Sequence, residues 1–205
     1  MSATIGSMGM GGALAAKKTG PPKAPLSWRL RNMVRPNYLS GWLGNHVAKL
    51  LTFVFGIPTM TAELKARVIR ADGTMIDYGT LGYRVVTTAF VNFVVDQLQT
   101  ETSVFGDFKY HDSGVGTTAE AVGDTDIETE DGESRATGTQ TEGAANIYQS
   151  VGTIAYTTTK AITEHGLFNA GAGVTLMDRT VFAAINVVNG DSIQFTYSLT
   201  VSAES

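Results

Sequence analysis

The predicted fold class rests on one stretch near the end of the chain, Ile193-Gln194-Phe195-Thr196-Tyr197-Ser198-Leu199-Thr200-Val201. Large apolar side chains alternate with Gln, Thr and Ser without a break. A period of two places every apolar side chain on one face of a β-strand. The polar face suits water or a neighbouring subunit. We therefore predict an antiparallel strand that is buried on one side.

Other stretches share this alternation. It is present in residues 146–156, and Val181, Ala183, Ile185 and Val187 also recur at a period of two. Between residues 61 and 69, Ala62, Leu64, Ala66 and Val68 alternate with Glu63, Lys65 and Arg67. Asp72-Gly73 and Asn189-Gly190 are dipeptides typical of tight β-turns, so each predicts a hairpin between its flanking strands.

One helix is predicted within this β-rich region, at about residues 87–99. Thr87 or Thr88 is a suitable N-cap residue. Phe90, Phe93, Val94 and Leu98 form an apolar helical face that we expect to pack on a sheet. We therefore predict a mainly β protein, with an antiparallel β-sandwich or barrel-like body over residues 61–205, one packed α-helix and an extended N-terminal arm.

Residues 1–60 are predicted to form the arm and an apolar docking segment. The first 25 residues are rich in Gly, Ala and Lys and show no period, so we expect either a free tail or an arm that becomes ordered on a partner. Residues 26–60 hold both tryptophans and many aliphatic residues. A short helix over about 42–54 is expected, with Pro36, Gly41, Gly44 and Gly56 breaking any longer one. This segment packs either on the chain's own body or against another subunit.

Charge is divided unevenly along the chain. Residues 1–62 hold seven Lys or Arg and no acidic residue, whereas residues 63–205 hold eight basic and 19 acidic residues, a balance of 8 − 19 = −11. A basic arm on an acidic body is typical of an interaction segment. Aromatic and basic residues interleave only around Trp28 and Arg29, so a protein partner is favoured over nucleic acid.

Composition excludes several classes of protein. The chain has no cysteine, which excludes disulfides and thiolate zinc sites. Its most apolar run, residues 50–60, is too short to span a bilayer, and no signal peptide is evident. We expect a protein made in the cytoplasm that has no membrane partner.

An acidic stretch over residues 120–133 is the one candidate for metal binding. Asp124, Asp126, Glu128 and Glu130 stand at alternate positions, so an extended backbone would place four carboxylates on one face. Calcium prefers such oxygen ligands. The spacing does not fit an EF-hand, and a solvated acidic loop is the favoured interpretation.

No catalytic constellation is visible in the sequence. His46, His111 and His165 are the only histidines. His111 adjoins Asp112, and His165 adjoins Glu164, but neighbours on a strand point to opposite faces. No nucleotide-binding loop or nucleophile motif occurs, so we expect a protein that is not an enzyme and has no cofactor.

Three short motifs carry a resemblance to a known group of proteins. They are Glu164-His165-Gly166-Leu167-Phe168, Arg179-Thr180-Val181-Phe182 and Gly190-Asp191-Ser192, and they follow the segments 108–120 and 135–140. With its pattern of E-x-GLF, R-x-x-F and GDS, the region from about residue 69 to the C-terminus resembles small β domains of tailed-bacteriophage virion proteins. The resemblance covers roughly two thirds of the chain and brings no catalytic residue.

The resemblance implies a non-enzymatic structural component of a phage particle. We expect a capsid decoration or cement protein that is located in the virion, forms a homo-oligomer and binds the major capsid protein through residues 1–60. The expected contacts are Trp28, Arg29, Arg31, Arg35 and Trp42. One alternative is a tail or neck component, such as an adaptor, collar or fibre-attachment ring subunit that binds portal or tail proteins. Another is a host- or carbohydrate-binding module, for which the acidic stretch is the motive.

Overall fold

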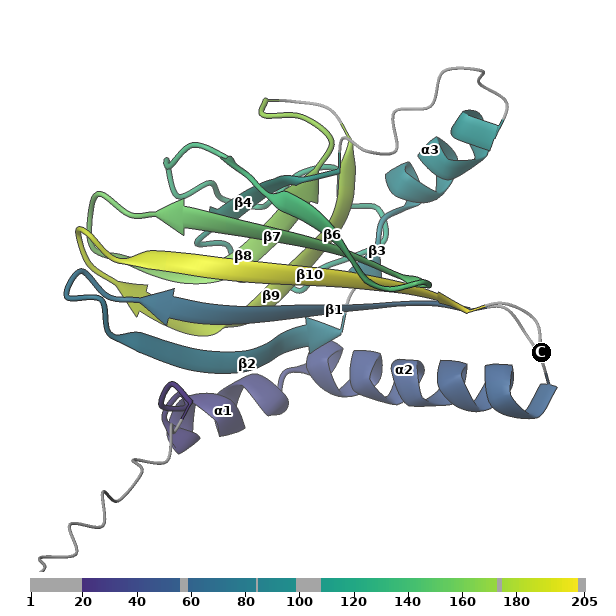
Figure 1. The fold of residues 1–205 in the computed structure, drawn as a ribbon, viewed down its shortest axis with the longest axis horizontal. Helices are drawn as coiled ribbons and strands as arrows, with labels where there is room; N and C mark the ends of the chain where they lie inside the picture. The colour runs from purple at the N-terminus through teal and green to yellow at the C-terminus, as the bar shows by residue number, and fades with distance from the viewer. Residues whose placement is uncertain (1–19, 56–58, 84, 99–107, 173–174, 203–205) are drawn as a thin grey trace, which may run out of the picture.

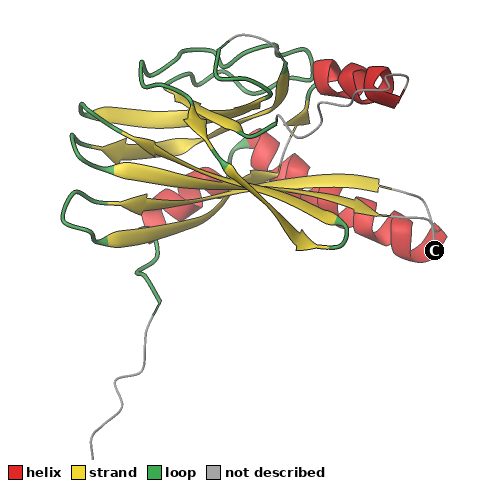
Figure 2. Ribbon diagram, turned by 45° about the horizontal axis from the view of Figure 1, so that its top comes forward, coloured by secondary structure: helices red, strands yellow, loops and turns green. Residues whose placement is uncertain are grey.

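Two antiparallel sheets packed face to face form the body of the protein (Figures 1 and 2). The computed structural model describes residues 20–55, 59–83, 85–98, 108–172 and 175–202. Strands make up 46% of the chain and helices 23%, so the prediction of a mainly β protein is confirmed. The arrangement is sandwich-like and not a closed barrel, which decides between the two predicted architectures.

Sheet A has the strand order β2-β1-β10-β7-β6. Its strands are β1 (Thr59–Ile69), β2 (Met75–Tyr83), β6 (Thr139–Ala144), β7 (Ile147–Ala155) and β10 (Ser192–Ser202). Sheet B has the order β3-β9-β8-β4-β5. Its strands are β3 (Val85–Val86), β4 (Tyr110–Gly114), β5 (Ala136–Thr137), β8 (Lys160–Phe168) and β9 (Leu176–Val187).

Three helices accompany the sheets, where the sequence predicted one packed helix and one short one. They are α1 (Leu26–Met33), α2 (Pro36–Phe55) and α3 (Thr88–Leu98). Helices α1 and α2 lie along the β2 edge, and α3 lies at one end of the sandwich (Figure 1).

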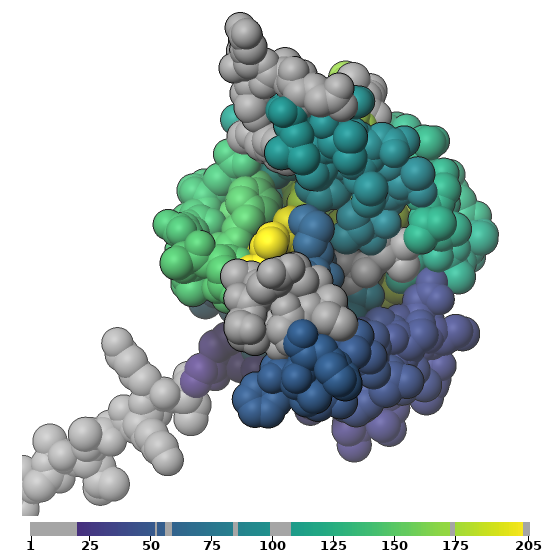
Figure 3. Space-filling view, turned by 90° about the vertical axis from the view of Figure 1, so that its right-hand side faces the viewer, coloured from purple at the N-terminus to yellow at the C-terminus, as the bar shows by residue number. Residues whose placement is uncertain are grey.

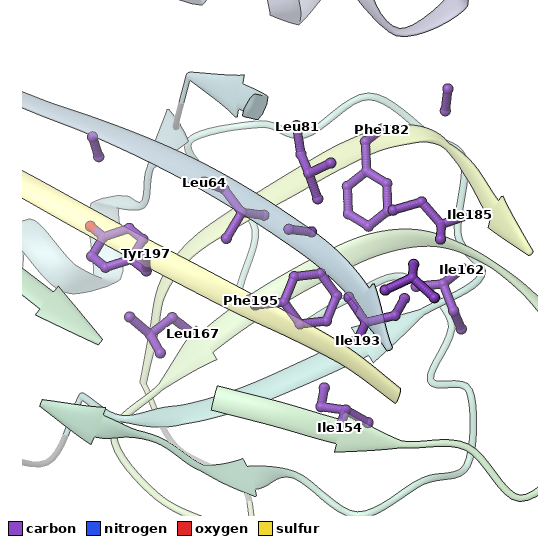
Figure 4. Packing of buried hydrophobic residues seen from close by; sticks show 14 of the residues in the cluster. Leu64, Leu81, Ile154, Ile162, Leu167, Phe182, Ile185, Ile193, Phe195 and Tyr197 are labelled. Carbon is purple, nitrogen blue, oxygen red and sulfur yellow. The ribbon is translucent and has the colours of Figure 1, made fainter. Parts of the chain in front are cut away.

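The core forms between the sheets as the alternation predicted. Ile193, Phe195 and Tyr197 of β10 are fully buried, and Leu64 and Val68 of the neighbouring strand β1 join them. Figure 4 shows side chains of this face, such as Ile193 and Phe195, beside residues of sheet B such as Phe182, Ile185 and Ile162. Val201 departs from the pattern, because β10 runs past the end of the core and leaves this side chain about half exposed.

The two predicted turns have different outcomes. Asp72-Gly73 does join β1 to β2 as a hairpin, with Gly73 at a φ of +82°. The hairpin predicted at Asn189-Gly190 is wrong, because β9 belongs to sheet B and β10 to sheet A. The chain therefore crosses between the layers there, with Gly190 at a φ of +89°, a conformation that glycine adopts without strain.

Asp191 holds this crossing in place. Its buried carboxylate accepts hydrogen bonds from the backbone N–H groups of Val188 and Ala71 and from Arg70. Burial alone would raise the pKa of Asp191, but these donors outweigh it and lower the pKa. The Asp191 carbonyl also accepts from the N–H of Tyr156. Asp191 thus links the β1–β2 turn, the connection that follows β7 and the crossing from β9 to β10.

Helix α2 is longer than the predicted segment of about residues 42–54, because Pro36, Gly41 and Gly44 do not break it; Gly56 lies outside the described residues. Pro36 stands at the first helical position, where its missing N–H costs nothing. Gly41 allows close packing: a Cβ atom there would lie 2.5 Å from the carbonyl oxygen of Tyr83. The glycine is therefore needed where the helix crosses β2.

Helix α3 is found where it was predicted, and its cap is confirmed. Thr87 Oγ1 accepts a hydrogen bond from the N–H of Phe90 at 3.2 Å. Its packing is lighter than predicted, however. Phe90 is buried, whereas Val91, Val95 and Leu98 are each more than half exposed.

Helix α1 fastens the two sheets together at an irregular point of β9. The pairing of β9 with β8 is interrupted between Ile162 and Glu164, which frees backbone groups of residues 182–184. The indole N–H of Trp28 donates to the carbonyls of Ala183 and Ala184, each at 2.9 Å. Asn32 accepts from the N–H of Ala183 at 2.9 Å and donates to the carbonyl of Leu81 on β2 at 2.8 Å. Buried backbone groups need such partners, so α1 completes the sandwich.

We predict that Asn32→Ala lowers the free energy of unfolding by about 2–4 kcal/mol, because two buried backbone groups lose their only side-chain partner. Urea denaturation measures this loss. The matched control is Arg31→Ala on the exposed face of the same helix, which should change the stability by less than about 0.5 kcal/mol. Equal effects of the two substitutions would contradict the role given to α1.

Candidate protein–protein interface on helices α1 and α2

An exposed apolar surface covers helices α1 and α2. We call it the α1–α2 surface. Its side chains are 44–86% exposed in the single chain. They are Leu26, Leu30, Met33, Val34, Leu39, Trp42, Leu43, Val47, Leu50, Phe53, Val54 and Phe55. Single exposed apolar residues are ordinary, but a set of this size on two consecutive helices is a candidate site of interaction.

The helix places its smaller or more polar side chains toward the body and its large apolar ones outward. Tyr38, Gly41, Asn45 and Ala48 follow each other at helical spacing and are partly buried. Tyr38 packs edge-on against Tyr83 of β2 with the ring centroids 5.5 Å apart. This arrangement inverts the usual orientation of an amphipathic helix on a sheet, where the large apolar side chains face the core.

Positive charge borders the surface. Arg29 and Arg31 are exposed on α1, and residues 20–62 contain no Asp or Glu to pair with them. Arg35 is half-buried, where it donates to the carbonyl of Phe182 at 3.3 Å. Burial lowers the pKa of Arg35, and the charge of Glu120 opposes this shift. The α1–α2 surface thus combines aliphatic, aromatic and Arg side chains, which are typical of interfaces.

The predicted contact residues divide into two groups. Arg29, Arg31 and Trp42 lie at the surface, with Trp42 44% exposed and packed on the His46 ring at 4.2 Å between centroids. Trp28 is only 4% exposed, and it and Arg35 bond to β9. The expectation that Trp28 contacts a partner needs correction, because this side chain belongs to the core.

The acidic stretch is folded against arginines and not gathered around a metal site. Asp124 and Glu128 lie 3.0 Å and 3.4 Å from the guanidinium of Arg179, and Asp126 lies 3.5 Å from that of Arg135. Glu130 is exposed at the point where its backbone pairs with Gly114. Within the described part of the chain, no group of three or more acidic or histidine side chains is placed to hold a metal ion.

Glu164 holds the loop over residues 115–130 in place. It is fully buried, and its carboxylate accepts from the N–H groups of Gly116, Glu128 and Thr129 at 2.8–2.9 Å. Arg179 lies 2.8 Å from the same carboxylate. The pair ties the loop over residues 115–130 onto strands β8 and β9.

The residues of the three motifs therefore have structural roles in this fold. Glu164 and Arg179, the charged residues of the first two motifs, form the buried ion pair. Phe182 packs in the core against Phe195, and Gly190 and Asp191 make the crossing between the sheets. The motifs mark the framework of the sandwich and not a binding surface.

A buried polar contact between the sheets escaped the sequence analysis. His111 of β4 lies 2.9 Å from His165 of β8 and 2.8 Å from Ser150 of β7, measured between side-chain N and O atoms. His111 lies 54 residues from His165 and 39 from Ser150 along the chain, so a comparison of sequence neighbours does not reveal these contacts. Gly152 was an available signal, since a Cβ atom there would lie 2.4 Å from the His111 ring. Both histidines are fully buried.

A second apolar feature lies between α3 and the adjacent end of the sandwich. A hollow of about 280 Å³ is lined by Met60, Phe90, Val94, Phe108, Tyr148, Met177, Leu199 and Val201. Figure 3 shows this end of the molecule, with α3 and the last turns of α2 both at the surface and β10 between them. Apolar surface is thus exposed at this end as well as along α2.

Comparisons with known proteins returned no match, whether to protein-family models, to curated proteins or to solved structures. No helix in the described ranges has the length and apolar character needed to cross a membrane.

We predict that Arg179→Met destabilises the protein by about 3–5 kcal/mol, because it leaves the Glu164 carboxylate buried without its cation. Thermal or urea unfolding measures the change. Arg67→Met is the control, because Arg67 is exposed on β1, and it should cost less than about 0.5 kcal/mol. A loss of stability for Arg179→Met as small as that of the control would show that the Glu164–Arg179 pair does not hold the loop in place.

We predict that Glu133 contributes to the loss of folding stability at low pH. Hydrogen bonds from Lys160 and from the N–H of Thr157 lower its pKa from 4.5 to about 2. A depressed carboxyl pKa adds stability above the unfolded value, and this stability is lost as pH falls through the folded value. The stability difference between the wild type and Glu133→Gln should therefore be constant above about pH 4.5 and shrink toward pH 2. The stability difference between the wild type and Lys160→Met should depend on pH in the same way. A stability difference that grows as the pH falls would refute the prediction.

Proposed function

We propose that this chain is a non-enzymatic structural component of a phage particle and, within that class, a capsid decoration or cement protein. The observation that carries the proposal is the α1–α2 surface, a large apolar face bordered by arginines. A single chain that leaves this face in water is poorly suited to act alone. The resemblance of the motifs to virion proteins points the same way.

The rest of the body suits such a component. Its motif residues are used for internal ion pairs, core packing and the crossing between sheets, which favours a rigid unit for repeated assembly. In a particle with many identical sites, weak contacts of each copy add up to firm attachment. Reversible binding of one isolated copy is compatible with a stable shell.

Attachment through the N-terminal part is supported by position. The described chain begins at Gly20, and Lys23 pairs in parallel with Asp77 at the β2 edge. Figure 1 shows this point beside α1, on the same side of the body as α2. The described chain therefore begins next to the α1–α2 surface, the face to which the proposal assigns the partner.

A tail or neck component is the alternative that shares these features. There the α1–α2 surface would join subunits of a ring and not face a shell. The acidic stretch was the reason to consider a host-binding module. The ion pairs of Asp124, Asp126 and Glu128 with arginines weaken that reason.

Copy number in purified particles tests the proposal. Quantitative mass spectrometry against the major shell protein should find hundreds of copies per particle for a decoration protein. About six to twelve copies would support the tail or neck alternative, and absence from the particle would refute both. The ranges follow from the symmetry of shells and rings.

Deletion of residues 1–19 tests the arm separately. This truncation keeps Trp28 and Asn32, so the sandwich should fold, whereas the particle affinity should fall. The control is the Leu98→Gln variant of the full chain, which changes an exposed apolar residue on α3 and not on α1 or α2. Unchanged affinity of the truncated chain would show that the arm is not an anchor.

A further inference from the structure

The outward face of α2 carries a pattern typical of paired helices. Leu43, Val47, Leu50 and Val54 are spaced by four, three and four residues, which is the spacing of alternating d and a positions in a heptad repeat. All four side chains are 44–58% exposed. They form a continuous line along the helix on the side away from β2, and we call this line the α2 seam.

The residue types along the seam specify the number of helices. Val47 and Val54 are β-branched and occupy the a positions, while Leu43 and Leu50 occupy the d positions. Valine at a with leucine at d favours two parallel helices over three or four. The seam therefore matches one further helix of the same kind.

Charge along α2 permits a second copy of the same chain. The helix has no Asp or Glu, and Lys49 and His46 are its only basic residues. Lys49 falls at the c position, outside the a and d line, so two copies would not place like charges across the seam. A heterologous acidic partner would find little positive charge on the seam itself.

The apolar area on α2 is adequate for a stable contact. A half-exposed side chain of this size presents roughly 80–120 Å², so the eight exposed apolar residues on α2 present roughly 640–960 Å². Each partner in a standard interface contributes about 800 Å². Two heptads are too short to form a coiled coil from free peptides, but α2 is already held on β2, so little ordering cost remains.

We propose that two copies of the chain associate through α2, with the helices parallel and in register along the α2 seam. The pair is isologous, and its two bodies lie on opposite sides of the seam. This inference rests on the proposed function, because it assigns a second copy of the chain as the partner of α2 within the α1–α2 surface. It leaves α1, with Arg29 and Arg31, for contact with other virion proteins.

The absence of cysteine makes a direct test available. A single Leu50→Cys substitution places two thiols opposite each other in a parallel, in-register pair, so mild oxidation should give a disulfide-linked dimer on a non-reducing gel. Lys49→Cys is the control, because it is exposed one residue away but points off the seam, and it should remain uncrosslinked. An antiparallel pair would instead crosslink a mixture of Val47→Cys and Leu50→Cys chains. That result, or equal crosslinking of Lys49→Cys, would overturn the proposal.

Mass in solution provides the second measurement. The full chain should behave as a species of 2 × 21.7 = 43.4 kDa by light scattering. Leu43→Gln/Leu50→Gln should raise the dissociation constant about 100-fold or more, since each lost leucine contact is worth at least about tenfold. Lys49→Gln should not change it, and circular dichroism should show that all variants are folded.

The outcomes separate this inference from the proposed function. A monomeric full chain at 21.7 kDa, or a dimer that persists in Leu43→Gln/Leu50→Gln, would overturn the α2 pairing. Neither result affects the copy number in particles. Conversely, a dimer that is absent from purified particles would support the pairing and refute the virion role.

Discussion

The attachment of α1 to the irregular segment of β9 determines how the rest of this protein is arranged. Backbone groups of residues 182–184 lie in the interior, where a missing hydrogen bond costs about 1–3 kcal/mol. Trp28 and Asn32 stand on successive turns of α1 and Arg35 lies just after the helix, and these three residues supply the partners. Because Asn32 also bonds to Leu81, the helix connects one sheet to the other. A sandwich with an irregular strand needs this helix to be complete.

The orientation of α2 follows from that attachment. Once α1 is docked, the chain enters α2 beside β2, and Gly41 allows the helix to approach the backbone of Tyr83. The face that meets the sheet is then the one with Asn45 and Ala48, and the large aliphatic residues turn outward. Burying them on the chain's own body would require rotation of the helix, which the contact at Gly41 prevents. The apolar outer face is thus a consequence of how the helix is held.

The opposite part of the body is stabilised by charge. Sheet B is covered by the loop over residues 115–130, which has few large apolar residues and is held by Glu164 and Arg179. A buried ion pair contributes little net stability compared with apolar packing. Leaving one partner buried alone is costly, however, so the pair disfavours any arrangement of the loop and strands that separates the two charges. The acidic stretch, which suggested a cation site, instead places Asp124 and Glu128 beside Arg179 and Asp126 beside Arg135. The charged network thus lies against sheet B, whereas α1 and α2 carry the exposed apolar surface.

The sequence by itself determined the β character, the strands β1 and β10, the first hairpin and the cap of α3, because these depend on local periodicity and turn chemistry. It also showed that residues 26–60 hold more apolar side chains than one face of a surface helix usually carries. Only the tertiary structure decided that Trp28 is internal while Trp42 is exposed, since a single helix pattern does not reveal which face a body occupies. The crossing at Asn189-Gly190, the arginine partners of the acidic stretch and the contact of His111 with His165 were likewise decided in three dimensions. Each joins groups from separate elements, and their pairing depends on which sheet each strand enters, a choice that local periodicity does not encode.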